Sequence, residues 1–385
     1  MGVSDAGVRK IGTGAATATA AQIRVMVVDD SHVIRGLLSR ALDTDPGIKV
    51  VVTAANGKAA VDEIAKHEID VIVLDIEMPV MDGMTALPLL IAARPGVQVI
   101  MASTLTLKGA SISMKALSRG AVDYVPKPTS TGEINSAEGF KRELISKVKS
   151  WGAAGKRKRP SGAAAAAPAA GSNLKRLYAA GPIKLRDMPT LFRPDCIAIG
   201  SSTGGPQALF KVFQMLGKVQ NLPVFVTQHM PATFTTILAE HLAQASGMPA
   251  AEAKDGEQVT SGRIYVAPGD FHMTVQMENG RKVLHLDKNP PENFCRPAVD
   301  PMLRSLAKVY GGKVLTLILT GMGHDGLNGG AEIINAGGVV AAQDEATSVV
   351  WGMPGAVTGA GLCSAVLPLS DIGPFLRKTI SRMAA

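Results

Sequence analysis

The sequence is poor in cysteine, in aromatic residues and in long apolar runs, and each shortage excludes a class of protein. The three cysteines, Cys196, Cys295 and Cys363, lack the spacing of a metal site or a disulfide framework and are typical of reduced thiols in a cytoplasm. Aromatic residues make up 4% of the 385 residues, too few for a platform that stacks single-stranded nucleic acid.

No apolar run in the sequence approaches the roughly 20 residues that a membrane-spanning helix needs. Residues 1–22 also lack the apolar stretch of a secretory signal and are rich in Ala, Gly and Thr. We therefore expect a disordered N-terminal extension, no membrane insertion and a cytoplasmic location.

The formal net charge of +8 suggests nucleic acid, but part of it lies in a stretch with the composition of a linker. Residues 156–159 and 175–176 are basic, and between them lies an alanine tract flanked by prolines. Because no helix-turn-helix, zinc-finger or aromatic RNA-binding pattern accompanies them, we expect no specific nucleic-acid partner. The expected organisation is an extension over residues 1–22, a domain over 23–148, a linker over 149–192 and a second domain over 193–385.

The first domain alternates strand-like and helix-like segments five times. Helices are expected at Gly57–Lys66, Met84–Ala92 and Ala110–Arg119, among others. Such repeated strand–helix units predict an α/β fold of flavodoxin-like type, with five parallel strands and helices on both faces. The expected strands are Ile23–Val28, Lys49–Ala54, Asp70–Leu74, Val97–Ala102 and Ala121–Val125.

Acidic residues follow two strands of this first domain. Asp29 and Asp30 come after the first strand and Asp75 after the third, so the three carboxylates should converge at the carboxyl edge of the sheet. A divalent cation such as Mg²⁺ would offset their repulsion. Ser103 and Lys127 end later strands, where they would contact a phosphate held beside the metal.

The second domain offers a hydroxyl, an imidazole and a carboxylate, each after an apolar run. Ser202 follows Cys196–Ile199, His229 follows Pro223–Gln228, and Asp325 follows the run that ends at Thr320. Sites in open parallel sheets form outside the carboxyl ends of the strands, so these three groups are expected to meet. A serine nucleophile needs an imidazole to take its proton and a carboxylate to orient the imidazole.

Each of these residues also has a simpler interpretation. A glycine-rich turn such as that around Ser202 is more often a phosphate cradle than the site of a nucleophile, although this one is not G-x-G-x-x-G and no P-loop lysine follows. His229 alone is compatible with an ordinary polar residue at a strand end, and Asp325 with the cap of a helix over residues 326–336. His324 invites a metal interpretation, but the sequence offers no further ligands at metal spacing. The catalytic hypothesis depends on the three groups together.

The first domain resembles the receiver domains of two-component response regulators. The matching stretches are VMVVDDS, VIVLDIEMPVMDG, VIMAST and DYVPKP, between Ile23 and about Ser150. This resemblance implies phosphorylation of Asp75, Mg²⁺ held by Asp29, Asp30 and Asp75, and readout of the phosphate by Ser103 and Lys127.

The second domain resembles the catalytic domain of the CheB family, the chemotaxis protein-glutamate methylesterases. The matching stretches are IAIGSSTGGP, TQHMPATFT, IYVAPGDFHM and LTGMGHDG. The resemblance implies a doubly wound, Rossmann-like domain that needs no cofactor. It places the nucleophile on Ser202 rather than Ser201, the base on His229 and the acid on Asp325. Backbone amides of Thr203 and Met322 are the implied oxyanion donors.

The order receiver, linker and CheB-type domain implies a response regulator that is activated by phosphorylation. Its expected reactions are hydrolysis of glutamate methyl esters, with release of methanol, and deamidation of selected glutamines. The expected partners are methyl-accepting chemoreceptors as substrate and a chemotaxis-type histidine kinase as phosphodonor. Two alternatives stay open: the same esterase in a pathway other than motility, and a non-catalytic phospho-dependent adaptor.

Overall fold

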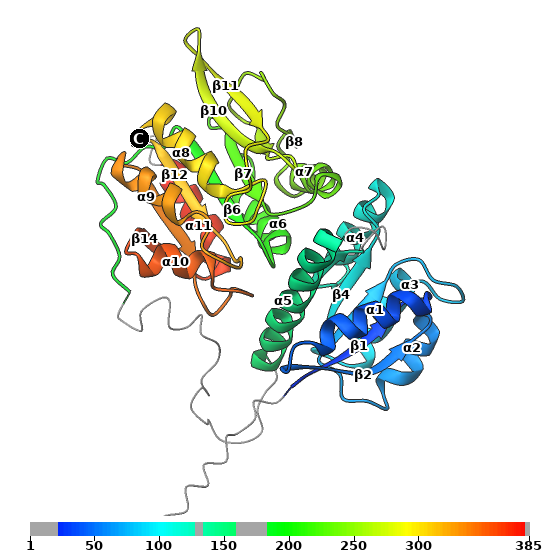
Figure 1. The fold of residues 1–385 in the computed structure, drawn as a ribbon. Coiled ribbons are helices and arrows are strands. Elements are labelled where there is room, and N and C mark those ends of the chain that lie inside the picture. Colours follow the sequence, from blue (N-terminus) through cyan, green and yellow to red (C-terminus); the bar gives the residue numbers. More distant parts are fainter. Residues whose placement is uncertain (1–21, 128–133, 159–182, 382–385) are drawn as a thin grey trace, which may run out of the picture.

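The computed structural model describes residues 22–127, 134–158 and 183–381, which form two α/β domains (Figure 1). In the N-terminal domain five strands form one parallel sheet in the order β2-β1-β3-β4-β5. This is the strand order of the flavodoxin-like fold, so the predicted fold of this half is confirmed. The strands are β1 (Ile23–Val28), β2 (Ile48–Ala54), β3 (Val71–Asp75), β4 (Gln98–Ser103) and β5 (Asp123–Pro126).

Five helices connect and cover these strands, and four of them begin at a polar residue that caps the first turn. The side chains of Ser31, Asn56, Asp82 and Thr106 each accept a hydrogen bond from a backbone N–H three residues later. The predicted helix bounds lie within three residues of those observed. The helices are α1 (His32–Asp43), α2 (Gly57–Ile64), α3 (Gly83–Ala93), α4 (Leu107–Ser118) and α5 (Ile134–Lys158).

Helix α5 is longer than the sequence pattern predicts. The expected linker starts at residue 149, but the helix continues to Lys158 because its apolar face is buried on the sheet. Trp151 is buried there, and its indole N–H donates to Asp123 Oδ2 at 2.9 Å. Residues 149–158 thus belong structurally to the first domain. The expected extension, apart from Gln22, and the expected linker from residue 159 to 182 lie outside the described residues.

The C-terminal domain has a seven-stranded parallel sheet in the order β14-β13-β12-β6-β7-β9-β8. From β6 the chain builds outward through β7 to β8 and β9, then returns to the other side of β6 for β12, β13 and β14. This doubly wound topology confirms the predicted fold. The strands are β6 (Cys196–Ser201), β7 (Val224–Gln228), β8 (Ala250–Glu252), β9 (Ile264–Val266), β12 (Val314–Ile318), β13 (Val339–Gln343) and β14 (Cys363–Leu367).

An antiparallel hairpin, β10 (His272–Glu278) and β11 (Arg281–Asp287), projects from this domain and was not predicted (Figure 1). It packs against α8, the helix that follows it in the chain. The helices of this domain are α6 (Gly205–Leu216), α7 (Ala232–Ser246), α8 (Val299–Tyr310), α9 (Leu327–Asn335), α10 (Met353–Gly359) and α11 (Leu369–Ser381).

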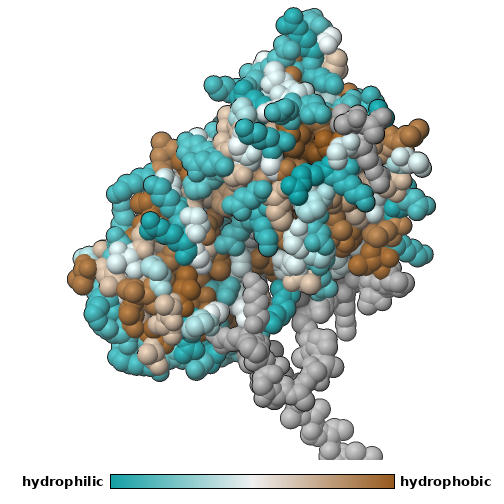
Figure 2. Space-filling view, turned by 180° about the vertical axis from the view of Figure 1, so that it is seen from behind, coloured by the Kyte–Doolittle hydropathy of each residue, from teal (hydrophilic) through white to brown (hydrophobic). Residues whose placement is uncertain are grey.

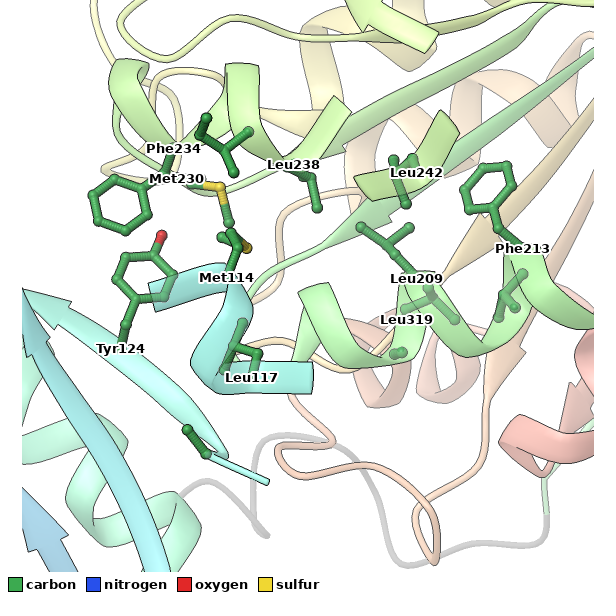
Figure 3. Close-up of a cluster of buried hydrophobic side chains, with 14 of the residues drawn as sticks. Met114, Leu117, Tyr124, Leu209, Phe213, Met230, Phe234, Leu238, Leu242 and Leu319 are labelled. Atoms are coloured by element: carbon green, nitrogen blue, oxygen red, sulfur yellow. The ribbon is translucent and has the colours of Figure 1, made fainter. Parts of the chain in front are cut away.

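The two domains share a buried apolar interface between α4 and β5 of the first and α7 of the second (Figure 3). The rings of Tyr124 and Phe234 stack there with centroids 4.2 Å apart. Beside them, Met114 of α4 lies near Met230, which precedes α7 (Figure 3). Gln207 of α6 donates to the carbonyl of Ala121 at 2.6 Å. One hydrophobic cluster therefore runs from the first domain into the second.

On the face shown in Figure 2, polar and apolar side chains are interspersed over both domains. Within the described residues, none of the helices combines the length and the apolar character that crossing a bilayer requires.

Candidate active site

The three residues proposed as a triad follow strands that are neighbours in the sheet. Strand β6 lies between β7 and β12, and Ser202 directly follows β6 while His229 directly follows β7. Asp325 lies in the loop between β12 and α9. This is the point where the direction of chain winding reverses, and crevices at such points bind ligands in open α/β sheets.

Close backbone packing fixes the turn that holds Ser202. The Ser202 N–H donates to the Thr320 carbonyl at 3.0 Å, which ties the turn to the end of β12. Gly204, at the start of α6, has a φ of +76° that a side chain would strain. A Cβ on Gly321 would lie 2.8 Å from the Ser202 Cβ, so only glycine permits this close approach. The loop after β12 is thereby held against the candidate nucleophile.

The imidazole of His229 and the carboxylate of Asp325 form a direct pair. His229 Nε2 lies 2.7 Å from Asp325 Oδ2, and both side chains are largely buried, with 10% and 1% of their surfaces exposed. The structure thus brings together His229 and Asp325, the residues that the sequence proposes as base and acid.

The Asp325 carboxylate also accepts backbone hydrogen bonds from the start of α8. The N–H groups of Val299 and Asp300 donate to its two oxygens at 2.6 and 3.0 Å, and that of Gly326 at 3.0 Å. In spite of burial, the hydrogen bond and charge of His229 hold the pKa of Asp325 below its usual value, and the backbone donors add to this effect. A helix N-terminus favours negative charge in the same way. Asp325 does cap a helix, but that helix is α8 rather than the expected one over residues 326–336.

A second buried carboxylate, Asp300, lies beside Asp325 and was missed by the sequence analysis. Asn293 bridges the two, because its Nδ2 donates to Asp325 Oδ1 at 2.9 Å and to Asp300 Oδ2 at 3.1 Å. Burial and the charge of Asp325 raise the pKa of Asp300. Neither Asn293 nor Asp300 directly follows a strand, so the strand-end pattern that located the other candidates gives no signal for these two residues.

The other ring nitrogen of His229 faces a thiol. Cys295 Sγ lies 3.3 Å from His229 Nδ1, whereas no hydrogen bond joins Ser202 Oγ to His229 within the parts of the chain that the structure describes. The nitrogen that would accept the serine proton is therefore occupied by Cys295. The sequence identified this cysteine only as a reduced thiol, and nothing in its spacing predicted the contact.

These neighbours change the proton affinity of the imidazole. Burial disfavours the charged ring, but charge interactions and hydrogen bonds with Cys295 and Asp325 outweigh it and raise the pKa of His229 to about 10. In this arrangement the imidazole holds its proton at neutral pH. It therefore has to be separated from a neighbour before it can act as a base.

The backbone N–H groups of Thr203 and Met322 are the oxyanion donors that the sequence analysis expects. Among the hydrogen bonds of the described residues, none uses the N–H of Thr203 or of Met322. Thr203 follows Ser202 directly, and Met322 follows Gly321, whose backbone packs on Ser202. Unpaired donors beside a nucleophile are what an oxyanion hole requires.

The N-terminal domain holds a separate acidic site. Oxygens of Asp29, Asp30 and Asp75 lie within 4.8 Å of one another, a donor set that suits a hard divalent cation. Burial raises the pKa of Asp75, and Asp29 adds to the effect while Lys127 opposes it. His324 belongs to no such group in the described part of the chain.

Lys127 closes the acidic site, whereas Ser103 does not contact it. Lys127 Nζ lies 2.6 Å from both Asp29 Oδ2 and Asp75 Oδ1. Ser103 Oγ instead donates to the Thr104 carbonyl at 3.2 Å. Of the two residues proposed to read out a phosphate, the structure brings one to Asp75 and leaves the other at its strand end.

The fold and these two sites define a class: a response regulator whose receiver domain is followed by an enzymatic output domain. The response regulator receiver domain family matches residues 25–137, and the CheB methylesterase family matches residues 197–376.

The chain belongs to the family of protein-glutamate methylesterases/protein-glutamine glutaminases. A protein of that name from Azospirillum brasilense is 59% identical over 376 residues, covering 94% of each chain. The protein-glutamate methylesterase/protein-glutamine glutaminase of group 2 operon from Rhodospirillum centenum is 59% identical, covering 94% of this chain and 95% of its own. The crystal structure of the Thermotoga maritima CheB methylesterase catalytic domain is 43% identical, covers 48% of this chain and 98% of its own, and has a TM-score of 0.47.

Replacing Ser202 by alanine is predicted to lower ester hydrolysis to background, because the attacking oxygen is lost while the turn is kept. Ser201→Ala is the matched control. Its hydroxyl donates to Gln228 Oε1 at 2.6 Å and is fully buried, so that variant should lose about 1–3 kcal/mol of stability yet remain active. Methanol release and urea unfolding measure the two effects. The reverse pattern would place the nucleophile on Ser201.

Stability is predicted to depend on pH through His229. Its pKa in the folded protein, about 10, lies above the ordinary value of 6.5. The stabilisation by the charged ring is therefore complete below about pH 6.5 and is lost as the pH rises through 10. Urea unfolding between pH 6 and 10 should show this decline in the native chain and a shallower one in Cys295→Ala. Parallel curves would mean that Cys295 does not raise this pKa.

Proposed function

We propose that this chain is a phosphorylation-activated esterase that hydrolyses glutamate methyl esters on chemoreceptors and deamidates selected glutamines. The observation that supports it best is the His229–Asp325 pair at 2.7 Å, at the same sheet edge as Ser202. Relatives named protein-glutamate methylesterase/protein-glutamine glutaminase cover nearly the whole chain. A non-catalytic adaptor would need neither this pair nor a serine beside unpaired amides.

In the proposed reaction Ser202 Oγ attacks the side-chain carbonyl carbon of the methylated glutamate, and His229 takes the serine proton. The amides of Thr203 and Met322 stabilise the resulting oxyanion. His229 then returns the proton to the leaving methoxide, which departs as methanol and leaves a glutamyl ester on the serine. Water activated by His229 hydrolyses this ester and frees the carboxylate.

Deamidation follows the same path with ammonia as the leaving group. The amide nitrogen is a poor leaving group until it is protonated, so His229 has to act as an acid at that step. Asp325 stabilises the charged imidazole throughout without taking its proton. One set of residues therefore serves both reactions.

We further propose that phosphorylation of Asp75 controls this activity. Asp29, Asp30 and Asp75 would hold Mg²⁺, which when bound offsets the charge of a phosphoryl group. A histidine kinase of the chemotaxis type is the expected phosphodonor, and the cytoplasm the expected location. In this structure the receiver reaches the candidate active site, because Ser146 Oγ of α5 contacts Met322 Sδ at 2.7 Å.

The activity is tested by incubating the full chain with methylated receptor membranes and measuring methanol, with and without acetyl phosphate and Mg²⁺. We expect methanol in both conditions and more with acetyl phosphate. Ser202→Ala serves as the control for hydrolysis by other proteins. An absence of methanol in all conditions would leave the adaptor as the better interpretation.

Receiver control predicts two results in the same assay. A fragment that starts at Ile183 should release methanol faster than the unphosphorylated full chain, because it lacks the receiver. The fragment starts there because the Arg186 N–H donates to the Cys363 carbonyl, which keeps this segment with the catalytic domain. Asp75→Asn should abolish the stimulation by acetyl phosphate and keep the basal rate. Equal rates for fragment and full chain would argue against inhibition by the receiver.

A further inference from the structure

The turn Glu292–Cys295 contacts the receiver and the candidate catalytic residues at once. Asn293 bonds the acid, Asp325, at 2.9 Å, and Cys295 faces the base, His229, at 3.3 Å. Between them, the ring of Phe294 lies under the guanidinium of Arg142 from receiver helix α5, with 5.3 Å from Cζ to the ring centroid. This spacing is that of a cation–π contact.

The turn is held firmly at both ends. The backbone N–H groups of Glu292 and Cys295 each donate to the other residue's carbonyl, at 3.1 and 2.9 Å. The Glu292 carboxylate also pairs with Arg304 of α8, where one contact is 2.9 Å. Asn293 is held in addition by the carboxylates of Asp300 and Asp325. A movement of the Phe294 ring is therefore passed to its other neighbour, Cys295.

Phe294 is an unfavourable residue for its position. Its φ is +63° and that of Asn293 is +52°, so both central residues of the turn are in the left-handed region. Turns of this kind favour Asn and Gly, whereas a bulky side chain there is strained. The Phe294 side chain is also 86% exposed, so it gains little from burial. A strained, exposed aromatic residue beside an active site calls for a functional explanation.

We propose that this turn couples the receiver to the catalytic acid–base pair, with Phe294 as the residue that Arg142 binds and Asn293 as the positioning residue of Asp325. The proposal deepens the proposed function and rests on it. While the receiver is docked, the turn holds Cys295 against His229 Nδ1, the nitrogen that Ser202 needs. When the receiver leaves, Phe294 loses its partner and Cys295 is no longer held there, while Asn293 keeps the acid in place.

Two neighbouring glycine substitutions in the full chain separate these roles. Glycine tolerates the left-handed backbone, so the turn persists in both variants. Phe294→Gly removes only the ring, and the methanol release of the unphosphorylated chain should rise about threefold, with no change at saturating acetyl phosphate. Asn293→Gly removes only the amide, and kcat at saturating acetyl phosphate should fall at least tenfold while KM stays within twofold.

The contact itself is tested by combining substitutions. Arg142→Ala should raise the unphosphorylated rate as much as Phe294→Gly does, and the double variant should exceed neither single variant, because both remove one interaction. Leu191→Gly is the matched control. It removes an equally exposed apolar side chain, 87% against 86%, outside the turn, and should leave the rates unchanged.

Small-angle scattering gives a readout that does not depend on activity. The unphosphorylated Phe294→Gly chain should have a larger radius of gyration than the native chain, because a share of receivers has undocked. An unchanged basal rate and radius in Phe294→Gly, or an unchanged kcat in Asn293→Gly, would overturn the coupling. If the native chain releases no methanol but Phe294→Gly still expands it, the proposed reaction fails and the receiver contact stands.

Discussion

The catalytic end of the second domain depends on one buried charge, the carboxylate of Asp325. Burying a carboxylate is costly unless hydrogen bonds and an opposite charge compensate for it. Here the compensation comes from three separate segments. They are the start of α8, the turn that contains Asn293, and the end of β7, where His229 lies. Because each segment contributes its own hydrogen-bond donor to Asp325, the carboxylate, His229 and the turn assemble as a unit, and displacing one segment disturbs the rest.

Because these segments depend on one another, the receiver domain can affect His229 and Asp325 without contacting Ser202. Helix α5 contacts two loops at the edge of the site, through Ser146 on Met322 and Arg142 on Phe294. One loop carries a candidate oxyanion donor and the other carries Asn293 and Cys295. In the proposed coupling, these contacts stabilise an arrangement in which His229 is paired with a thiol instead of with the serine.

The sequence predicted the site residues that follow strands and missed those that do not. The receiver sheet and strands β6, β7 and β12 of the second sheet were predictable because buried strands give apolar runs, which Ser202, His229 and the receiver aspartates follow. The rest of the second sheet was expected only from the family resemblance. Asn293 and Cys295 lie between a hairpin and a helix, and Asp300 lies in the first turn of that helix, so none of them follows an apolar run that would report its position. The expected linker began inside α5 for a related reason: the charged surface of this helix conceals a buried face, formed by Leu144, Val148, Trp151 and Ala154.

The path from Asp75 to the interface is short in the chain. Lys127, which pairs with Asp75, lies three residues beyond Tyr124, whose ring stacks on Phe234 of the catalytic domain. A phosphoryl group on Asp75 would add negative charge beside this lysine and draw it closer. Because β5 is short and its carboxyl end is bonded to Ser103 through the Lys127 N–H, a displacement of Lys127 would bear on the strand that carries Tyr124. The stacked pair and the Arg142–Phe294 contact both join the receiver to the catalytic domain. Loosening the first would therefore weaken the second.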